Sequence, residues 1–257
     1  MKNIIVPTDF SKKAQYAAEM AFDLAKLMEC KVRIVHRKSP DSSSAEALNK
    51  IDSIHKIPAG LEKEIMIVEG ELMLSLENMI KSEGECIVIM GSQGKTNAED
   101  LNLGSQAQKA VRLLDCPVIV VNSVVDISKF DSIIFASNFN TEAKSSFEIV
   151  MFFARLFKSE IHLLTIDAPA FFNLPRIIVR ESMRNFKEMA GDVKCHIHDF
   201  PDKSVIDGIE HFVQKVGADI LTIGTYGKKT SRIFSGSIAE AMIGKIEIPV
   251  MTINMKN

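Results

Sequence analysis

Two glycine-rich loops in this chain have the residue types and the spacing of a phosphate-binding site. They run Gly91-x2-Gly94-x9-Gly104-Ser105 and Gly224-x2-Gly227-x8-Gly236-Ser237. Because glycine has no Cβ, backbone N–H groups in such loops can approach a phosphate closely. A helix that begins where the loop ends adds unpaired amides and the positive end of its dipole. The residues therefore predict a ligand that carries phosphate.

Each loop follows a short apolar run and precedes a helix-like stretch. The runs are Ile87–Ile89 and Ile220–Ile223, and Ser105 and Ser237 are residues that favour the start of a helix. A strand, a glycine-rich turn and a helix N-terminus together form a common anion site. The first loop is not a Walker motif, because Ile89 stands where that motif needs its first glycine.

Asp9 is the candidate for the opposite end of the ligand. It closely follows an apolar run near the N-terminus, as Gly91 follows its own. In parallel α/β sheets, ligands bind at the carboxyl ends of the strands where the strand order reverses. Asp9 and Gly91 are therefore predicted to face one crevice, where Asp9 accepts hydrogen bonds from ligand hydroxyl or amino groups. The other interpretation is an aspartate that starts a turn or a helix.

The similarity between the two halves extends beyond the loops and indicates a duplication. Ile4–Ser11 corresponds to Ile133–Asn140, and the closing segment Cys116–Asn122 corresponds to Ile248–Asn254. A chain of 257 residues has the length of two ordinary domains. We expect domain 1 over residues 1–125 and domain 2 over residues 129–257.

Strand and helix signals alternate through each half. Ser11 and Asn140 are predicted to cap the first helix of their half, and a longer connection follows each second strand, over residues 39–62 and 168–192. Five strands per half that alternate with helices imply an α/β fold. We expect two tandem α/β domains, each a five-stranded parallel sheet flanked by helices.

Composition excludes some classes of function. The formal net charge is −2, and no long Lys/Arg run favours binding to nucleic acid. No apolar run approaches the roughly 20 residues that span a bilayer, and no leader precedes the first strand, so a cytoplasmic protein is expected. The four cysteines are scattered, which is typical of small packing residues in a reducing compartment.

The separated motifs of domain 1 resemble those of the universal stress protein family. They are Pro7–Ser11, the glycine loop with its Gly104-Ser105 ending, and Cys116–Val121, and they recur in order in the second half. The resemblance implies two tandem Rossmann-like domains of the adenine nucleotide alpha hydrolase-like type. It also implies an adenine-nucleotide site for ATP or AMP. The glycines and Ser105 would hold phosphate and ribose, Asp9 and its neighbours the adenosine, and the backbone of Arg37 the adenine.

The resemblance assigns site residues in both domains. In domain 1 they are Pro7, Thr8, Asp9, Arg37, Met90, Gly91, Gly94, Lys95, Gly104, Ser105 and Gln106, and in domain 2 Asn138, Ile166, Gly224, Gly227, Lys228, Gly236 and Ser237. No catalytic residue or resident metal is expected, although bound Mg²⁺ would reverse the effect of nearby carboxylates on phosphate.

Both domains depart from the family pattern. The first loop carries Glu99-Asp100, which repel phosphate if they point inward and are harmless if they face solvent. The second loop is basic, with Lys228, Lys229 and Arg232, but it is one residue short, and Asn138 replaces the aspartate. Since family members divide into ATP-binding and non-binding types, the fold alone does not settle binding.

Two classes of function follow. The first is a nucleotide-binding stress-response module, in which occupancy changes a surface read by an unknown protein partner. The second is an interaction or scaffold protein with vestigial pockets. Efficient catalysis has little support, and at most weak ATP hydrolysis with Asp9 as the base is expected. The closing strands are predicted to pair edge to edge, giving an internal pseudo-dimer and a possible homodimer.

His196 and His198 form one further pattern. Alternate residues of a strand share a face, so the two side chains, with Cys195 and Asp199 nearby, are candidate metal ligands. No second ligand pair lies near them in sequence, which favours the polar edge of a strand instead.

Overall fold

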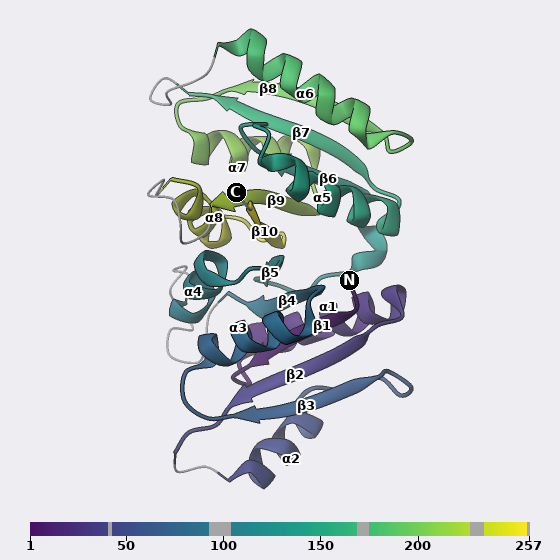
Figure 1. Ribbon diagram of the computed structural model, residues 1–257, viewed down its shortest axis with the longest axis vertical. Helices are drawn as coiled ribbons and strands as arrows, with labels where there is room; N and C mark the ends of the chain where they lie inside the picture. The colour runs from purple at the N-terminus through teal and green to yellow at the C-terminus, as the bar shows by residue number, and fades with distance from the viewer. Residues whose placement is uncertain (41–42, 93–103, 169–174, 227–233, 256–257) are drawn as a thin grey trace. The chain divides into compact units, whose positions relative to one another are not determined.

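A computed structural model describes residues 1–40, 43–92, 104–168, 175–226 and 234–255 of the chain. The chain divides into two compact units, Met1–Ile127 and Ser128–Asn257. Each unit is an α/β domain built on five strands (Figure 1).

Unit 1 contains one five-stranded sheet in which every adjacent pair is parallel. The strand order is β3-β2-β1-β4-β5. In chain order the elements are β1 (Asn3–Thr8), α1 (Lys12–Met28), β2 (Lys31–Arg37), α2 (Ser44–Ile54), β3 (Lys63–Val68), α3 (Leu72–Glu83), β4 (Cys86–Gly91), α4 (Ser105–Leu113) and β5 (Val118–Val121).

Unit 2 repeats this topology, with the strand order β10-β9-β6-β7-β8 and only parallel pairs. A short 3₁₀ turn, η1 (Ile127–Lys129), precedes it. Its elements are β6 (Ser132–Ala136), α5 (Ala143–Phe157), β7 (Glu160–Asp167), α6 (Arg176–Ala190), β8 (Cys195–Pro201), α7 (Val205–Val216), β9 (Ile220–Tyr226), α8 (Phe234–Lys245) and β10 (Val250–Met255). The predicted fold class is confirmed in both units.

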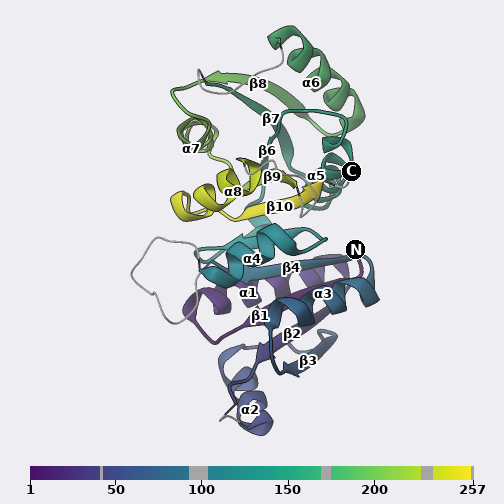
Figure 2. The same cartoon turned by 60° about the vertical axis from the view of Figure 1, so that its left-hand side comes forward.

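The central strands are mostly apolar because helices cover both faces of each sheet (Figure 2). Ile4, Ile5 and Val6 of β1 and the Ile87–Ile89 run of β4 have no exposed surface. In unit 1, α1 packs against β1 and β4, while α3 and α4 pack against each other. Such burial on both faces explains why these strands read as continuous apolar runs.

The predicted helix starts are correct in unit 1 and shifted in unit 2. Ser11 caps α1, and its Oγ accepts the amide of Ala14 at 3.2 Å. Asn140 Oδ1 accepts the amide of Ala143 at 3.1 Å, but α5 begins only at Ala143, because a turn over residues 141–142 precedes it.

The expected cap serines of the glycine loops are also displaced. α4 begins at Ser105, so the cap position belongs to Gly104, which offers no side chain to the free amides. α8 begins at Phe234, which places Ser237 within the helix.

Two helices lie in the connections for which the sequence analysis predicted no element. α2 starts with a reciprocal capping box, in which Ser43 Oγ accepts the amide of Glu46 and the Glu46 carboxylate accepts the amide of Ser43. The S-x-x-E spacing is a capping-box pattern that marks a helix N-terminus and can be recognised in the sequence. α6 follows Pro175, a residue that often precedes or opens a helix.

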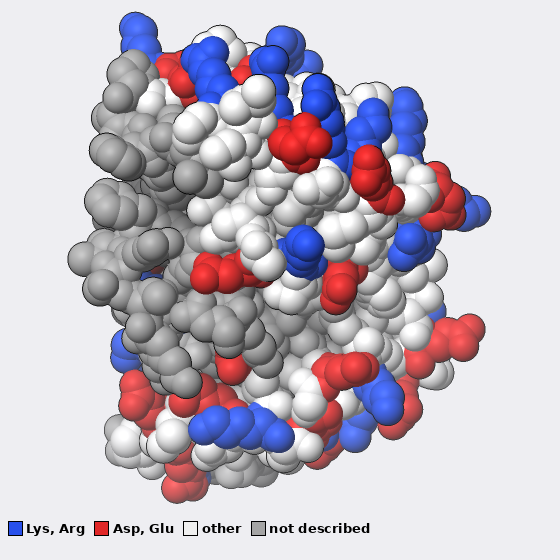
Figure 3. Space-filling model, turned by 45° about the horizontal axis from the view of Figure 1, so that its top comes forward, with Lys and Arg blue, Asp and Glu red and all other residues white. Residues whose placement is uncertain are grey.

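Charged side chains of both signs are interspersed on the face shown in Figure 3. Pairing on α6 is an example: Arg180 lies 3.2 Å from Asp199, Arg184 lies 2.8 Å from Glu181, and Arg176 pairs with Asp167. Among the described residues, no helix is long and apolar enough to cross a membrane. Cys86, Cys116 and Cys195 are free and buried, as expected of packing residues.

Candidate functional site

The candidate site of unit 1 lies where β1 and β4 are neighbours. The chain leaves β1 towards β2 on one side and leaves β4 towards β5 on the other, so the strand order reverses between them. The crevice at such a point is the usual ligand site of an open parallel sheet. Pro7 and Thr8 end β1, and Met90 and Gly91 end β4, so the structure brings these four predicted residues to one place.

The residues that flank the glycine loop of unit 1, Ser92 and Gly104, are hydrogen-bonded to each other. The amide of Gly104 donates to the carbonyl of Ser92 at 2.8 Å, and the amide of Ser92 donates to the carbonyl of Val121 at 3.1 Å. The end of β4 is thereby tied to the first residues of α4, where Ser105 and Gln106 are exposed. We call this junction, formed by Gly91, Ser92 and Gly104, the loop neck.

Gly91 has a structural role that the sequence did not reveal. A Cβ on this residue would lie 2.6 Å from the carbonyl carbon of Lys13 and 2.8 Å from the amide nitrogen of Ala14. Real Cβ atoms do not approach backbone this closely, so only glycine lets β4 and the first turn of α1 pack together. The glycine is therefore required by the fold of the site, whatever ligand the site holds.

Lys13 reaches the loop neck from α1. Its Nζ donates to Ser92 Oγ at 3.0 Å, across 79 positions of sequence. Burial lowers the pKa of the Lys13 ammonium, and Ser92 is 2% exposed. Neither Lys13 nor Ser92 was predicted as a site residue from the sequence, because nothing in the local pattern of an amphipathic helix marks one lysine as facing a distant loop.

Asp9 starts the turn into α1. Its Oδ1 accepts the amide of Ser11 at 3.0 Å, as an Asx-turn aspartate does, and Phe10 between them has a φ of 66°. The alternative interpretation of Asp9, as a turn residue, is thus part of what it does. The half-buried carboxylate also lies at the end of β1, where a ligand at the switch point would meet it.

Thr8 is held by two histidines. Thr8 Oγ1 lies 2.8 Å from His55 Nε2, and His36 Nδ1 lies 2.8 Å from the Thr8 carbonyl oxygen. The ring of Phe10 packs on His36 with centroids 4.4 Å apart. His55 is 2% exposed, and burial lowers its pKa. These contacts fix the end of β1, and the exposed Arg37 follows His36 on β2.

The corresponding residues of unit 2 have the same backbone geometry and different side chains. Ser137 Oγ accepts the amide of Phe139 at 3.1 Å, and Asn138 Oδ1 accepts the amide of Asn140 at 3.4 Å. Phe139 has a φ of 52°, close to that of Phe10. Gly224 lies on β9 opposite Ile253 of β10.

Some predicted site residues are not described in structure. Gly94, Lys95, Gly227 and Lys228 lie outside the described residues. Gly236 and Ser237 lie in the first turn of α8.

Ile166 of unit 2 does not offer its side chain to a ligand. It is 8% exposed, and it packs on α7, where a Cβ on Gly208 would lie 2.7 Å from Ile166 Cγ2. A ligand at this position would therefore meet the backbone of Ile166 alone.

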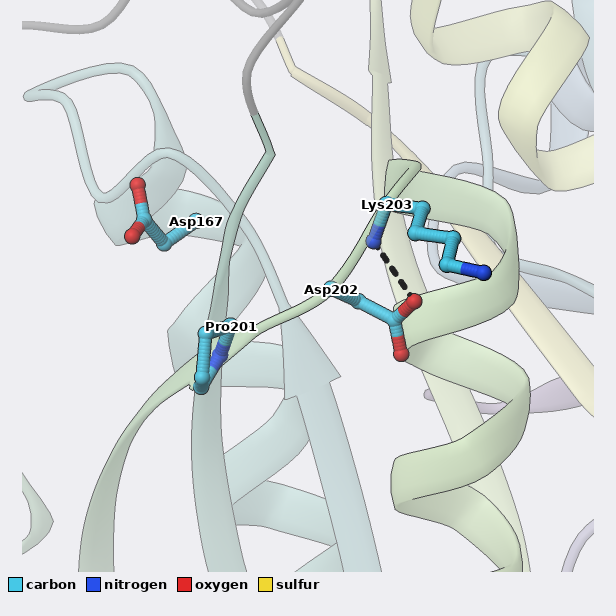
Figure 4. Close-up of a pocket in the computed structure, with 4 residues that line it drawn as sticks. All are labelled: Asp167, Pro201, Asp202 and Lys203. Atoms are coloured by element: carbon cyan, nitrogen blue, oxygen red, sulfur yellow. Dashed lines mark hydrogen bonds between the residues drawn. The ribbon is translucent and has the colours of Figure 1, made fainter.

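A shallow hollow of about 500 Å³ adjoins Ile166 at the carboxyl ends of β7 and β8 (Figure 4). Asp167, Pro201, Asp202 and Lys203 line it, and the two carboxylates point away from each other. Asp202 accepts the amide of Lys203 at 2.7 Å and pairs with His211 at 2.7 Å. These carboxylates disfavour phosphate in the hollow, whose place suits the base or the ribose end of a ligand.

The histidines singled out in sequence join a third histidine from the neighbouring strand. His162 Nδ1 lies 3.0 Å from His198 Nε2, and the rings of His162 and His196 are stacked with centroids 5.2 Å apart. Glu160 Oε2 lies 3.3 Å from His196 Nε2 and 2.5 Å from Lys194 Nζ. We call these three histidines and Glu160 the histidine cluster.

The histidine cluster differs from the matching part of unit 1. Among the described residues, no group of three or more His, Cys, Asp or Glu side chains could hold a metal ion. By strand register, His196 matches Glu64 and His198 matches Met66. Unit 1 uses fixed charges there: Lys31 and Arg33 each lie 2.8 Å from Glu64.

We expect unit 2 to lose stability as the pH falls below 6.5, the ordinary pKa of histidine. Burial, with the nearby charges of His162, His196 and Lys215, lowers the pKa of His198 to about 4, and burial lowers that of His162. Since the fold favours the neutral rings, their stabilisation is complete above pH 6.5 and is lost as the pH falls towards 4. The Lys194 ammonium lowers the pKa of Glu160 to about 2, which adds a loss in the same direction from pH 4.5 downward.

Urea unfolding followed by hydrogen exchange of unit 2 peptides, between about pH 7.5 and about pH 5, measures this loss. The matched control is His198→Met, the residue that unit 1 has at this position. The variant should have a flatter pH dependence than the wild type, and an unchanged pH dependence would contradict the assignment.

The sequence of this chain is similar to those of known proteins. The sequence model of the universal stress protein family matches residues 1–56 and 44–122, both within unit 1. A universal stress protein of Methanocaldococcus jannaschii is 26% identical over 152 residues, covering 47% of this chain and 94% of the relative. Another from the same organism is 25% identical over 138 residues, covering 47% of this chain and 81% of that relative.

Solved structures match both units together. A universal stress protein from Archaeoglobus fulgidus has a TM-score of 0.79 at 18% identity, covering 99% of this chain and 98% of that one. A putative universal stress protein from Pseudomonas aeruginosa has a TM-score of 0.71 at 18% identity, covering 99% and 93%. At these identities the likeness shows the fold, and it extends over the half that the family model does not reach. Unit 1 belongs to the universal stress protein family, and unit 2 repeats the fold of unit 1 in tandem.

Proposed function

We propose that unit 1 binds an adenine nucleotide, ATP or AMP, and that occupancy of the site regulates a protein partner. The observation that carries the proposal is the closed loop neck: Gly104 donates to the Ser92 carbonyl at 2.8 Å, directly beside the carboxyl end of β1. The loop neck thus lies beside a switch point, the usual place of a ligand in an open parallel sheet.

The chemistry of the site supports a phosphorylated ligand. Gly104 occupies the cap position of α4 without a side chain, so the first amides of the helix receive no hydrogen bond from the cap residue. Helix N-terminal amides bind phosphate well. At the other end of the crevice, the half-buried Asp9 provides carboxylate oxygens for the hydroxyl and amino groups of an adenosine, and Thr8 precedes it at the end of β1. Bound Mg²⁺ belongs to this proposal as a companion of the phosphates.

Unit 2 is proposed as a second, different site. Asn138 takes the place of the aspartate and presents an amide, and the hollow beside Asp167 and Asp202 offers room for a base or a ribose. The loop that follows β9 carries Lys228, Lys229 and Arg232 in sequence. The unit 2 site would therefore differ from the unit 1 site in both selectivity and affinity.

The direct test is to denature freshly purified protein and to quantify released nucleotide by chromatography and mass spectrometry. Calorimetric titration of the emptied protein with ATP and AMP follows. One or two nucleotides per chain would support the proposal and count the working sites. No release and no heat at roughly millimolar ligand would favour the interaction protein with vestigial pockets instead.

Gly104→Val is expected to weaken nucleotide binding at the unit 1 site by at least about tenfold, since it places a branched side chain where phosphate approaches an amide. Gly104 has φ −62° and ψ 147°, a backbone conformation that valine adopts readily. The fold should therefore persist, which circular dichroism can check. The matched control is Gly236→Val, which tests the corresponding loop of unit 2; unchanged affinity in both variants would place binding elsewhere.

We propose a cytoplasmic location and a protein partner that recognises the occupied site. We further propose that the closing strands β5 and β10 are pairing edges, within the chain and between two copies of it. An interaction protein that binds no nucleotide is the second candidate, and the change from Asp9 to Asn138 between the two units favours it.

A further inference from the structure

Lys13 places a positive charge at the loop neck of unit 1. It is the second residue of α1, and its backbone lies against Gly91 while its Nζ donates to Ser92 Oγ at 3.0 Å. Gly104, the cap residue of α4, donates to the Ser92 carbonyl at 2.8 Å. The ammonium, the Ser92 side chain and the start of α4 therefore converge on one point of the crevice.

The Lys13 ammonium is partly removed from solvent at this position, which disfavours its charged form. Lys13 is half-buried, and burial lowers its pKa. A phosphate anion at the loop neck would form charge-assisted hydrogen bonds with this ammonium, and such bonds are stronger in a partly dehydrated site. A neutral ligand at the same place would not.

The repeat provides a comparison within the chain. In the matched segments Thr8–Ala14 and Ser137–Ala143, Lys13 corresponds to Glu142. Glu142 precedes α5, and its carboxylate accepts a hydrogen bond from Asn140 Nδ2 at 3.1 Å. The sign of the charge at this position is thus reversed between the two units, although the preceding turn is alike, with a positive φ at both Phe10 and Phe139.

We propose that Lys13 contacts phosphate and determines the specificity of the unit 1 site, selecting phosphorylated adenine nucleotides over adenosine. The inference rests on the proposed function of unit 1 and assigns to α1 the side-chain cation of that site. Unit 2 has no such cation on α5 at this position, so the two sites draw on different elements for the charge that phosphate requires.

The test is calorimetric titration of the full chain with ATP, AMP and adenosine, in the wild type and in three variants. Lys13→Met removes the charge, and Lys13→Arg keeps it. Lys12→Met is the matched control, because Lys12 is exposed and lies over the ring of Tyr16 at 5.8 Å, away from the loop neck. Where the titration shows two binding events, the one that Gly104→Val weakens is assigned to the unit 1 site.

Lys13→Met should weaken ATP binding about tenfold or more and leave adenosine binding within about twofold, since only the phosphates lose a charged partner. Lys13→Arg and Lys12→Met should retain the wild-type preference for ATP. Raising the salt concentration should weaken ATP binding in the wild type more than in Lys13→Met.

Two results would overturn the inference while leaving the proposed function intact. One is that Lys13→Met binds both ATP and adenosine with the affinities of the wild type. The other is an equal loss of both ligands, which would show that Lys13 acts only by holding Ser92 and the loop neck. A wild-type protein that binds neither ATP nor adenosine would instead remove the proposed function itself.

Discussion

Gly91→Ala is expected to destabilise unit 1 by about 1–3 kcal/mol and to weaken nucleotide binding with it. The added Cβ would lie 2.6 Å from the carbonyl carbon of Lys13 and 2.8 Å from the Lys13 carbonyl oxygen. Both are backbone atoms of the first turn of α1, which cannot rotate away as a flexible side chain would. The helix must therefore move off the end of β4, and the contact between Lys13 and Ser92 moves with it.

Urea unfolding followed by far-ultraviolet circular dichroism measures the loss, since the chain has no tryptophan and only two tyrosines. Because two units unfold in one experiment, hydrogen exchange of peptides from α1 and β4 must assign the transition to unit 1. Gly104→Ala is the matched control, since the φ of −62° at this residue suits alanine. Equal stability of Gly91→Ala and the wild type would show that the close approach does not constrain the site.

Phe186→Ala is expected to lower the free energy of unfolding of unit 2 by about 3–5 kcal/mol. Phe186 is 1% exposed, and its ring packs edge-on against Phe139 and Phe147 with centroids 5.3 Å and 5.2 Å away. Phe135 completes the group at 6.4 Å. Removing one ring leaves a cavity among three large, buried neighbours that can collapse only partly.

The loss should extend to the candidate site of unit 2. Phe139 follows Asn138 with a φ of 52°, a conformation that costs energy and persists only when packing fixes it. Exchange of amides near Asn138 should therefore increase in the variant. Phe152→Ala is the control, because this ring on α5 is 36% exposed and its removal should cost less than about 1 kcal/mol. Similar losses in the two variants would contradict the assigned role of the aromatic group.

The described elements show where sequence patterns suffice. Ser11 and the apolar spacing of Ala14, Ala17 and Ala21 predict α1, and the structure confirms both the cap and the buried face. α2 shows the opposite case: its capping box is readable, but its short apolar stripe is weak, with only Ala47 and Ile51 buried. Short helices with few buried residues have little periodicity to detect.

The sequence by itself determined the repeat, the alternation of strands and helices, the parallel sheets and the two glycine loops at their strand ends. Each of these depends on spacing along the chain, which local geometry converts directly into structure. The tertiary structure alone decided that Gly91 must be glycine because of Lys13 and Ala14, and that Lys13 reaches Ser92. It also decided that His162 joins His198 across two strands. These contacts join residues far apart in sequence, and they depend on how a crossover helix or a neighbouring strand packs, which no local pattern encodes.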